Sequence, residues 1–242
     1  MSDSVIALVT GANKGIGYEI AAGLAAKGAT VLVGARDAER GRAAAEALTG
    51  AGGAAVHVPL DVTDAASVAA AAKWIDDRYG RLDVLVNNAG VLLDWGVPPS
   101  RVTPDALRGT YEVNVFGVVA VTNALLPLLR RAPAARIVNL SSEMGSLAVA
   151  SDPGSRYAQN PVLAYTSSKT ALNMVTLGYA NELRDTPIKV NAADPGYCAT
   201  DQNGHTGPRT AAQGANAAVR LATLGPDGPT GGYFTEDASV PW

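Results

Sequence analysis

The chain contains 242 residues, of which 48% are hydrophobic, 19 are Lys or Arg and 22 are Asp or Glu, so the formal net charge is −3. This composition excludes an intrinsically disordered chain, and the small negative charge provides no basic field that would attract nucleic acid or an anionic membrane. Cys198 is the single cysteine, which excludes an intrachain disulfide and a cysteine-based metal cluster. We predict one domain over residues 1–242.

The N-terminal segment lacks the features of an export signal. Residues 1–9 contain neither a basic region nor a long apolar segment, and no run in the chain approaches the roughly 18 apolar residues that a bilayer span requires. We therefore expect a cytoplasmic protein without membrane or nucleic-acid partners.

Short apolar segments alternate with Ala-rich segments of helical spacing along the chain. Strands are predicted at Val5–Val9, Thr30–Val33, Ala54–Val58, Val84–Val86, Ile137–Leu140 and Lys189–Ala193. Helices are predicted at Gly15–Lys27, Ala38–Thr49, Ala65–Tyr79, Thr103–Arg130 and Ala164–Arg184. The strands are almost continuously apolar, which is typical of a parallel sheet that is buried on both faces. We therefore predict an α/β fold, a doubly wound parallel sheet flanked by helices on both faces.

Residues at the segment boundaries support this assignment. Asp37 and Asp64 stand where a helix N-cap is expected, and Gly28, Gly50 and Gly80 stand where helices should end. The predicted bounds are therefore consistent with the local capping preferences.

Two polar segments rich in turn-forming residues interrupt the alternation, at Ala148–Pro161 and Thr200–Arg209. Each follows a strand or a candidate site residue, and ligands of open α/β sheets bind beyond the carboxyl ends of the strands. We predict that both are substrate-side loops; ordinary surface loops are the alternative.

The segment after the first strand reads Thr10-Gly11-Ala12-Asn13-Lys14-Gly15-Ile16-Gly17 and leads into a helix. Gly11 would permit a tight turn, Gly15 would let the backbone approach a pyrophosphate, and Gly17 would let the helix pack against the sheet. A simple turn would explain three glycines as well, but the position between strand and helix favours dinucleotide binding.

This T-G-x-x-x-G-x-G turn resembles that of the short-chain dehydrogenase/reductase family. Further motifs of the family follow in order over essentially the whole chain: Asp61-Val62, Asn87-Asn88-Ala89-Gly90, Asn114, Ser142, Tyr165-x-x-x-Lys169 and Pro195-Gly196. The resemblance implies a single-domain Rossmann-type fold and an oxidoreductase. It also implies these cofactor contacts: Gly11, Asn13, Lys14, Gly15, Ile16, Gly17, Arg36, Asp61, Val62, Asn88, Ala89, Gly90, Tyr165, Lys169, Pro195, Gly196, Ala199 and Thr200. In that set, the Ala199 amide and the Thr200 hydroxyl would contact the nicotinamide carboxamide.

The end of the second strand indicates which dinucleotide binds. An acidic residue there would accept hydrogen bonds from the ribose of NAD, but Ala35 stands at this position and Arg36 follows. Arg36 and Lys14 suit a 2′-phosphate. Asp37 is expected to cap a helix instead, with its side chain turned toward backbone amides. We therefore predict NADPH/NADP+ as cofactor; ordinary solvated surface charges are the alternative for the two cations.

Tyr165 and Lys169 lie four residues apart in a predicted helix, so they share one face. By resemblance, Lys169 would bind the nicotinamide ribose and lower the pKa of Tyr165, which would act as general acid. Ser142 would hydrogen-bond the substrate oxygen, with Ser141 as the rival assignment. Asn114 would hold a water linked to Lys169. The alternatives are an aromatic ring beside a surface lysine, a structural serine and a helix-distorting asparagine.

The remaining candidates for polar chemistry form no recognisable cluster. Cys198 has no neighbouring base in the sequence, and His57 and His205 lack nearby cysteines or a carboxylate cluster. We expect no metal site, and we expect both histidines to be structural or solvent-facing.

The interval between Ser142 and Tyr165 is longer than is usual in the family. This insertion, the Asn13-Lys14 pair and the C-terminal segment 232–242 resemble the carbonyl-reductase branch. The leading hypothesis is NADPH-dependent reduction of a small-molecule ketone, aldehyde or quinone. An NADP-dependent alcohol dehydrogenase working oxidatively and a non-catalytic NADP-binding sensor or scaffold are the alternatives. Whether the protein is a monomer or a homo-oligomer stays open. The apolar pocket candidates, some of which could belong to the core, are Leu92, Leu93, Trp95, Met144, Tyr157, Tyr197 and Trp242.

Overall fold

A computed structural model of the protein describes residues 4–155, 157 and 162–242. Seven strands form a parallel sheet in the order β3-β2-β1-β4-β5-β6-β7. The strands are β1 (Ile6–Thr10), β2 (Thr30–Ala35), β3 (Ala54–Pro59), β4 (Val84–Asn87), β5 (Arg136–Leu140), β6 (Lys189–Ala193) and β7 (Tyr233–Phe234). The strand order reverses between β1 and β4, and such a switch point is where open α/β sheets bind ligands.

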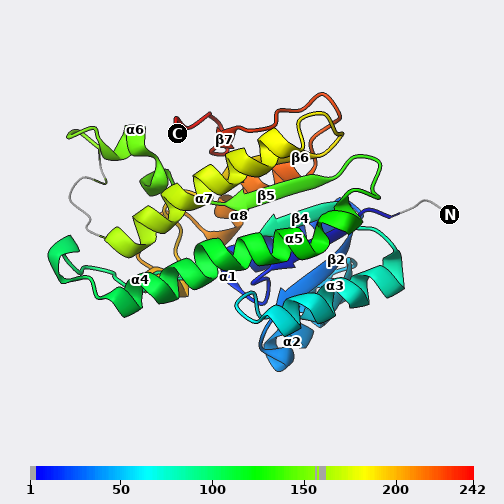
Figure 1. Ribbon diagram of the computed structural model, residues 1–242. Coiled ribbons are helices and arrows are strands. Elements are labelled where there is room, and N and C mark those ends of the chain that lie inside the picture. Colours follow the sequence, from blue (N-terminus) through cyan, green and yellow to red (C-terminus); the bar gives the residue numbers. More distant parts are fainter. Residues whose placement is uncertain (1–3, 156, 158–161) are drawn as a thin grey trace.

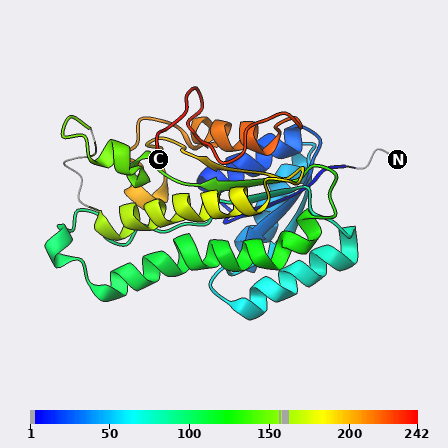
Figure 2. The same ribbon diagram turned by 45° about the horizontal axis from the view of Figure 1, so that its top comes forward.

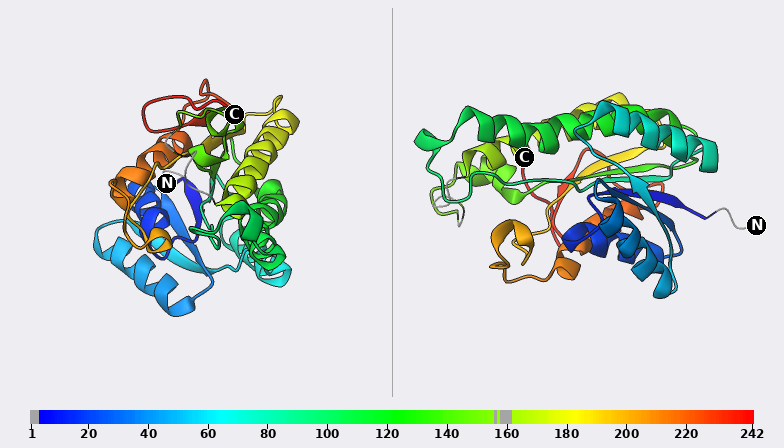
Figure 3. Two further views of the ribbon diagram at one scale, coloured as in Figure 1. Left: turned by 90° about the vertical axis from the view of Figure 1, so that its left-hand side faces the viewer. Right: turned by 90° about the horizontal axis from the view of Figure 1, so that it is seen from below.

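Helices cover both faces of the sheet (Figure 3). One layer contains α1 (Gly15–Ala26), α2 (Ala38–Gly50) and α8 (Ala211–Ala222). The other contains α3 (Ala65–Tyr79), α4 (Pro104–Tyr111), α5 (Gly117–Leu129) and α7 (Leu163–Glu182). Figure 2 shows α7 beside the long helix formed by α4 and α5. The predicted doubly wound α/β fold is confirmed.

The sheet separates two apolar clusters. Val9, Val33 and Val86 face α1, α2 and α8 within one cluster, whereas Leu8, Leu32 and Leu85 face α3 and α5 within the other. All six side chains have essentially no solvent exposure. Because neighbouring residues of a strand point to opposite faces, burial on both sides explains the continuous apolar runs in the sequence.

The predicted strands and capping residues agree closely with the structure. The Asp37 carboxylate accepts hydrogen bonds from the backbone N–H groups of Glu39 and Arg40, and that of Asp64 accepts one from Ala66. Two elements near the C-terminus, β7 and α8, were not predicted. Strand β7 has only two residues and carries no periodic signal, whereas α8 is amphipathic and begins with a capping box of Thr210 and Gln213, a local signal that the sequence analysis did not use.

The predicted helix Thr103–Arg130 is divided by a π-helical turn, η2 (Glu112–Phe116), between α4 and α5. Such turns insert a residue into the helical ladder and often occur at functional sites. Asn114, a candidate site residue, lies in the middle of this turn.

The expectation that no segment is long and apolar enough to cross a membrane was wrong in terms of length and composition. The continuous helical segment Pro104–Leu129 has 26 residues. An 18-residue window within it has a mean hydropathy of 1.6, and half of that window is buried inside the protein. Val121, Leu125 and Leu129 in this segment pack in the core beneath the sheet. Burial of this kind is also what a core helix of a globular protein requires.

The remaining short helices lie near the carboxyl ends of the strands: η1 (Pro99–Arg101), η3 (Glu143–Gly145), α6 (Leu147–Ala150) and η4 (Asp201–Asn203). In Figure 1, α4 and α6 lie at the end of the molecule opposite the N-terminus. These connections surround the candidate site.

Candidate active site

A cleft of about 1030 Å³ lies at the carboxyl ends of the strands. We call its two parts the cofactor end, lined by residues 11, 13–17, 35–36, 60–63, 88–90 and 199–203, and the substrate end, lined by residues 91–93, 95, 113, 142, 144, 157, 165 and 195–197. The predicted cofactor-binding residues and the predicted catalytic residues Ser142, Tyr165 and Lys169 line this one cleft, whereas Asn114 is fully buried.

The glycine-rich turn at the cofactor end is held by Asn88, which follows β4. The Asn88 side-chain amide donates hydrogen bonds to the carbonyl oxygens of Thr10 (2.8 Å) and Gly11 (3.2 Å). Gly11 has φ = 65°, a conformation that favours glycine, and a Cβ on Gly17 would lie 2.5 Å from the Gly11 carbonyl oxygen. The turn therefore needs both glycines. Asn88 lines the cleft and also holds the turn in position.

Arg36 lies exposed at the carboxyl end of β2, directly after Ala35. The neighbouring carboxylates are engaged locally: Asp37 caps α2, and Asp61 accepts hydrogen bonds from the Thr63 backbone N–H (3.0 Å) and hydroxyl (2.7 Å). The hydrogen bonds from Thr63 and the charge of Arg36 lower the pKa of Asp61. Arg36 thus stands at the cofactor end as a cation whose acidic neighbours have other partners.

Lys14 in the glycine-rich turn forms an ion pair with Asp201 at 2.5 Å, and Asp201 also bonds to His205 at 2.8 Å. The loop of residues 200–209 therefore lies against the cofactor end. Asp201 attaches this loop to the glycine-rich turn, and its predicted role as a substrate-side element stays a prediction.

Both ends of that loop are tied together. The Ala199 N–H donates to the Arg209 carbonyl oxygen at 2.8 Å, and the contact of this amide with a nicotinamide carboxamide stays a prediction. The Thr200 side chain lines the cleft and lies next to Gly15.

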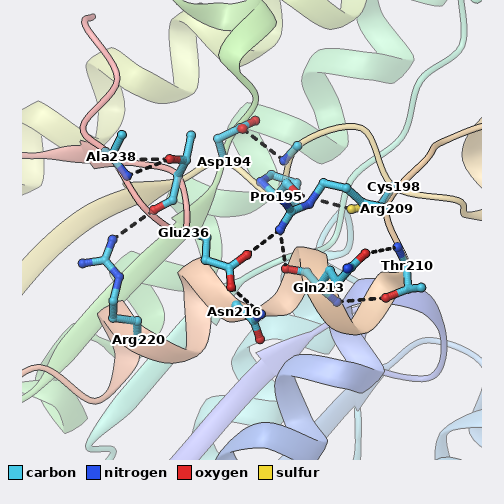
Figure 4. A network of polar contacts seen from close by, with 12 residues as sticks. Asp194, Pro195, Cys198, Arg209, Thr210, Gln213, Asn216, Arg220, Glu236 and Ala238 are labelled. Carbon is cyan, nitrogen blue, oxygen red and sulfur yellow. Dashed lines mark hydrogen bonds and ion pairs between the residues drawn. The ribbon is translucent and has the colours of Figure 1, made fainter.

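Arg209 anchors the loop to the C-terminal part of the chain (Figure 4). Its guanidinium donates to Glu236 at 2.6 Å and to the Gln213 carbonyl oxygen at 2.9 Å, and Asn216 donates to the same Glu236 carboxylate at 2.8 Å. Sequence analysis missed Arg209 and Glu236 as partners, because they lie 27 positions apart and no local pattern relates them.

Tyr165 and Lys169 project from α7 into the cleft, as predicted from their spacing. The Lys169 ammonium lies 5.6 Å from the centre of the Tyr165 ring and donates to the Leu140 carbonyl oxygen at 2.8 Å. Lys169 is only 4% exposed. A cation is therefore fixed beside the phenol at the junction of the two ends of the cleft.

Burial dominates the protonation of both groups. It raises the pKa of Tyr165 to about 12, with an opposing contribution from the Ser142 hydroxyl and a further rise from the Asp194 carboxylate. Burial also lowers the pKa of Lys169 to about 8. The expectation of a lowered Tyr165 pKa is wrong for these protein groups, because burial disfavours the phenolate more than its neighbours stabilise it.

The two serines after β5 point in different directions. Ser142 lines the cleft within hydrogen-bonding reach of Tyr165. Ser141 is 2% exposed and donates to the Asn173 side chain on α7 at 2.6 Å. This arrangement favours Ser142 over the rival Ser141 as the group that meets a substrate.

Asn114 is fully buried in the π-helical turn η2. Its side chain exchanges two hydrogen bonds of 2.9 Å with the backbone of Val91 and donates to the Ser168 hydroxyl at 3.0 Å. Asn114 therefore joins the segment after β4 to α7, one residue before Lys169. The predicted link to a lysine-bound water stays a prediction.

Asp94 is a site residue that sequence analysis missed. It is 1% exposed, and its carboxylate accepts hydrogen bonds from the backbone N–H groups of Ala164 (2.7 Å) and Tyr165 (3.4 Å). These N–H groups belong to the first turn of α7, where a carboxylate is favoured by the helix dipole. The 70 positions between Asp94 and Ala164 hide this cap from any local sequence signal.

The histidines and the cysteine do not come together. His57 bonds to the Ala35 carbonyl oxygen at 3.1 Å, and His205 bonds to Asp201. Cys198 is 3% exposed and burial raises the pKa of its thiol, which makes it a poor nucleophile. Within the described residues, no group of three or more His, Cys, Asp or Glu side chains is arranged to hold a metal ion.

Most of the predicted pocket residues line the substrate end: Leu92, Leu93, Trp95, Met144, Tyr157 and Tyr197. Trp242 does not, because it stacks on Tyr233 (ring centres 5.4 Å apart) in a small core cluster. Of the predicted loop 148–161, residues 156 and 158–161 lie outside the described residues. Tyr157 in this loop donates to the Glu143 carboxylate at 2.9 Å.

A family profile described as short chain dehydrogenase matches residues 5–210. The chain belongs to the short-chain dehydrogenase/reductase family. Among the curated relatives of this chain, short-chain dehydrogenase anuI of Penicillium roqueforti is 36% identical to it over 97% of this chain and 95% of the relative's length. The (-)-isopiperitenone reductase of Mentha piperita is 33% identical over 97% of both chains.

Solved structures of the same family have the same architecture. The NADPH-bound carbonyl reductase from chicken fatty liver superposes with a TM-score of 0.85 and 28% identity, covering 98% of both chains. The short-chain dehydrogenase/reductase fold of this protein is therefore complete from β1 to β7, and the chain is an oxidoreductase.

Proposed function

We propose that this short-chain dehydrogenase/reductase reduces a small-molecule ketone, aldehyde or quinone to the alcohol, with NADPH as the hydride donor. The observation that carries the proposal is the joint placement of Tyr165, Ser142 and Lys169 in a cleft that continues into the glycine-rich turn. The carbonyl reductase named among the similar structures supports the same reaction class.

The residues of the cofactor end fit a dinucleotide. A Cβ on Gly11 would lie 3.0 Å from the Ala89 backbone and one on Gly17 would meet Gly11, so the turn presents bare backbone at the start of α1. Backbone N–H groups at a helix N-terminus suit the pyrophosphate. Arg36 and Lys14 suit the 2′-phosphate of NADPH, since Ala35 stands where an NAD-binding protein would have a carboxylate.

The glycine-rich turn, Arg36 and Lys14 would hold NADPH, which would supply the hydride for the carbonyl carbon. Tyr165 donates its phenolic proton to the carbonyl oxygen, so that one hydride and one proton convert the C=O bond into an alcohol. The Ser142 hydroxyl hydrogen-bonds the same oxygen and stabilises its developing charge. Lys169 stabilises the phenolate that forms on Tyr165, which solvent then reprotonates.

The protonation of Tyr165 suits its proposed role. Burial raises its pKa to about 12, so the phenol carries the proton that a general acid donates. The reductase named among the relatives makes an alcohol dehydrogenase working oxidatively the weaker candidate. A non-catalytic sensor is weaker still, because binding alone has no use for Ser142 and Tyr165 side by side.

The decisive experiment is the Tyr165→Phe variant, with Tyr179→Phe as a matched control on the same helix. Tyr179 donates to Asn123 outside the cleft. Tyr165→Phe should lower ketone-dependent NADPH oxidation by at least about 100-fold, while fluorescence titration shows retained NADPH binding. Unchanged turnover in Tyr165→Phe would overturn the proposed mechanism.

The cofactor assignment is tested by Arg36→Ala, with Arg42→Ala on α2 as the exposed control. Loss of a charge-assisted bond should weaken NADPH by about 10- to 100-fold and leave NADH binding unchanged. Equal weakening of both cofactors would contradict recognition of the 2′-phosphate. The cytoplasmic location stays a prediction, and the choice between monomer and homo-oligomer stays open.

A further inference from the structure

Large apolar side chains are exposed at the substrate end of the cleft. Leu93 is 53% exposed and Trp95 is 51% exposed, and both line the cleft that contains Tyr165. Exposing an indole to water costs free energy that a ligand covering it would recover, at about 25 cal/mol per Å² of apolar surface. Their position next to Tyr165 makes a substrate the natural ligand.

Trp95 forms a stacked pair with Tyr197. Their ring centres lie 6.3 Å apart and their planes differ by 12°. Trp95 belongs to the segment after β4, and Tyr197 belongs to the segment after β6, so the pair joins two connections that are distant in sequence. Both rings line the cleft. We call Trp95 and Tyr197 the aromatic pair.

The backbone beside each ring is anchored. Asp94, directly before Trp95, is bonded to the start of α7 and hence to the backbone of Tyr165 itself. Directly before Tyr197, the Gly196 N–H donates to the Asp194 carboxylate at 3.0 Å. The Tyr197 and Thr206 hydroxyl groups are also hydrogen-bonded to each other. The rings therefore occupy positions set relative to the catalytic phenol.

The charges near the substrate end already have partners within the protein. Asp194 accepts hydrogen bonds from the backbone N–H groups of Glu143 and Gly196, and Lys169 donates to the Leu140 carbonyl oxygen. Among the described residues that line the cleft, the other basic side chains, Lys14, Arg36 and His205, lie at the cofactor end or on its loop. Arg156 lies outside the described residues.

From these observations we propose that the aromatic pair of Trp95 and Tyr197 determines substrate specificity and selects neutral ketones with a flat ring system over small acyclic ketones and 2-oxo acids. A ring would stack on the pair while its carbonyl oxygen meets Tyr165 and Ser142. Aromatic contacts favour this geometry, and an anionic group would find no free cation among the described residues at the substrate end. This inference rests on the proposed carbonyl reduction.

The test compares kcat/KM for three probes: 1-tetralone as a flat neutral ketone, butan-2-one as a small acyclic ketone and pyruvate as a 2-oxo acid. The wild-type enzyme should prefer 1-tetralone. Trp95→Ala should lower kcat/KM for 1-tetralone about tenfold and change that for butan-2-one less than about twofold. Trp95→Phe should restore most of the loss, and Tyr197→Leu should behave like Trp95→Ala.

Met174→Ala is the control, because Met174 is a 63% exposed apolar residue on α7 that does not line the cleft. An equal loss for 1-tetralone and butan-2-one in Trp95→Ala would overturn the specificity role, and so would a wild-type preference for pyruvate. If wild-type enzyme oxidises NADPH with none of the probes, the proposed function fails instead. Calorimetric binding of 1-tetralone then tests the pair separately: equal affinity of wild type and Trp95→Ala would overturn it.

Discussion

The two ends of the cleft are built in different ways. At the cofactor end, backbone atoms of β1, α1 and β4 approach closely, and the side chain of Asn88 fixes the glycine-rich turn through two carbonyl oxygens. At the substrate end, side chains from long connections meet, as when Asp94 reaches the first turn of α7. At the first end an added Cβ on Gly17 would collide with the Gly11 carbonyl oxygen, whereas the second end depends on a few long-range contacts.

This contrast separates what the family shares from what one member does. Close backbone packing suits a cofactor of fixed shape, since a dinucleotide always presents the same pyrophosphate. Side chains on loops suit a variable substrate, because they can be exchanged without disturbing the sheet. Variants at the cofactor end should therefore abolish binding, and variants at the substrate end should alter rate or preference.

The largest effect is expected for Gly17→Ala. The new Cβ would lie 2.5 Å from the Gly11 carbonyl oxygen, and backbone has little freedom to move. We expect NADPH affinity to fall at least about 100-fold, since overpacking here should cost about 3 kcal/mol. Fluorescence titration measures the change.

Gly178→Ala on α7 is the matched control, because its added Cβ would have nothing within 4 Å. That variant should bind NADPH normally and gain about 0.5–1 kcal/mol of stability. Normal NADPH binding by Gly17→Ala would contradict close packing as the basis of the cofactor end.

The next effect concerns Lys169, which joins the two ends. Burial lowers its pKa from 10.5 to about 8 in the folded protein. Between these values the unfolded chain binds a proton that the folded chain has released, so the free energy of unfolding should rise with pH from about 8 to 10. The total gain should be on the order of 3 kcal/mol.

Urea unfolding at several pH values measures this contribution as the difference between wild type and Lys169→Met. The variant should lack the rise, while Lys27→Met, at an exposed lysine, should retain it. Identical pH dependence of wild type and Lys169→Met would show that burial does not disfavour the charged lysine.

The cofactor end could be predicted largely from sequence because its residues follow strands within a few positions. Gly11, Arg36 and Asn88 all stand directly beyond β1, β2 and β4, and the carboxyl ends of parallel strands meet at one edge of the sheet. The cap by Asp37 was also a local signal. Short-range patterns therefore sufficed for the strands and the turn, and the positions that the family resemblance implied as cofactor contacts line the cleft.

The substrate end could be predicted only in its residue types. Trp95 and Tyr197 were recognised as pocket residues, but their stacking joins two connections that no local pattern relates. Trp242 was assigned to the pocket, although it stacks on Tyr233 in the core. Likewise no local pattern relates the loop 200–209 to the glycine-rich turn, because the ion pair between Lys14 and Asp201 spans 187 positions.

A smaller effect is expected for Asp94→Ala. Its removal leaves the N–H groups of Ala164 and Tyr165 without their acceptor, which should cost about 2 kcal/mol of stability. Displacement of Tyr165 should lower kcat about tenfold while the NADPH dissociation constant stays the same. Asp94→Asn, which keeps an acceptor oxygen, should recover much of kcat.

Asp64→Ala is the comparison that isolates positioning from stability. Asp64 also caps a helix, α3, but no residue of that helix lines the cleft. This variant should lose comparable stability and keep its kcat. If the two variants lower kcat equally, Asp94 stabilises the fold without positioning Tyr165.

The smallest effect is expected for Arg209→Ala, which removes the side chain that holds the loop 200–209. Arg209 holds the loop 200–209 through Glu236, yet both side chains are about one-third exposed, so solvent screens their ion pair. Loss of this anchor should free the loop that carries Thr200 and Asp201. The KM for NADPH should rise a few-fold, about 1 kcal/mol, with kcat unchanged.

Arg130→Ala removes an ion pair with Glu182 far from the loop and should change neither constant. A lower kcat in Arg209→Ala, with KM unaffected, would instead assign the loop to the substrate end.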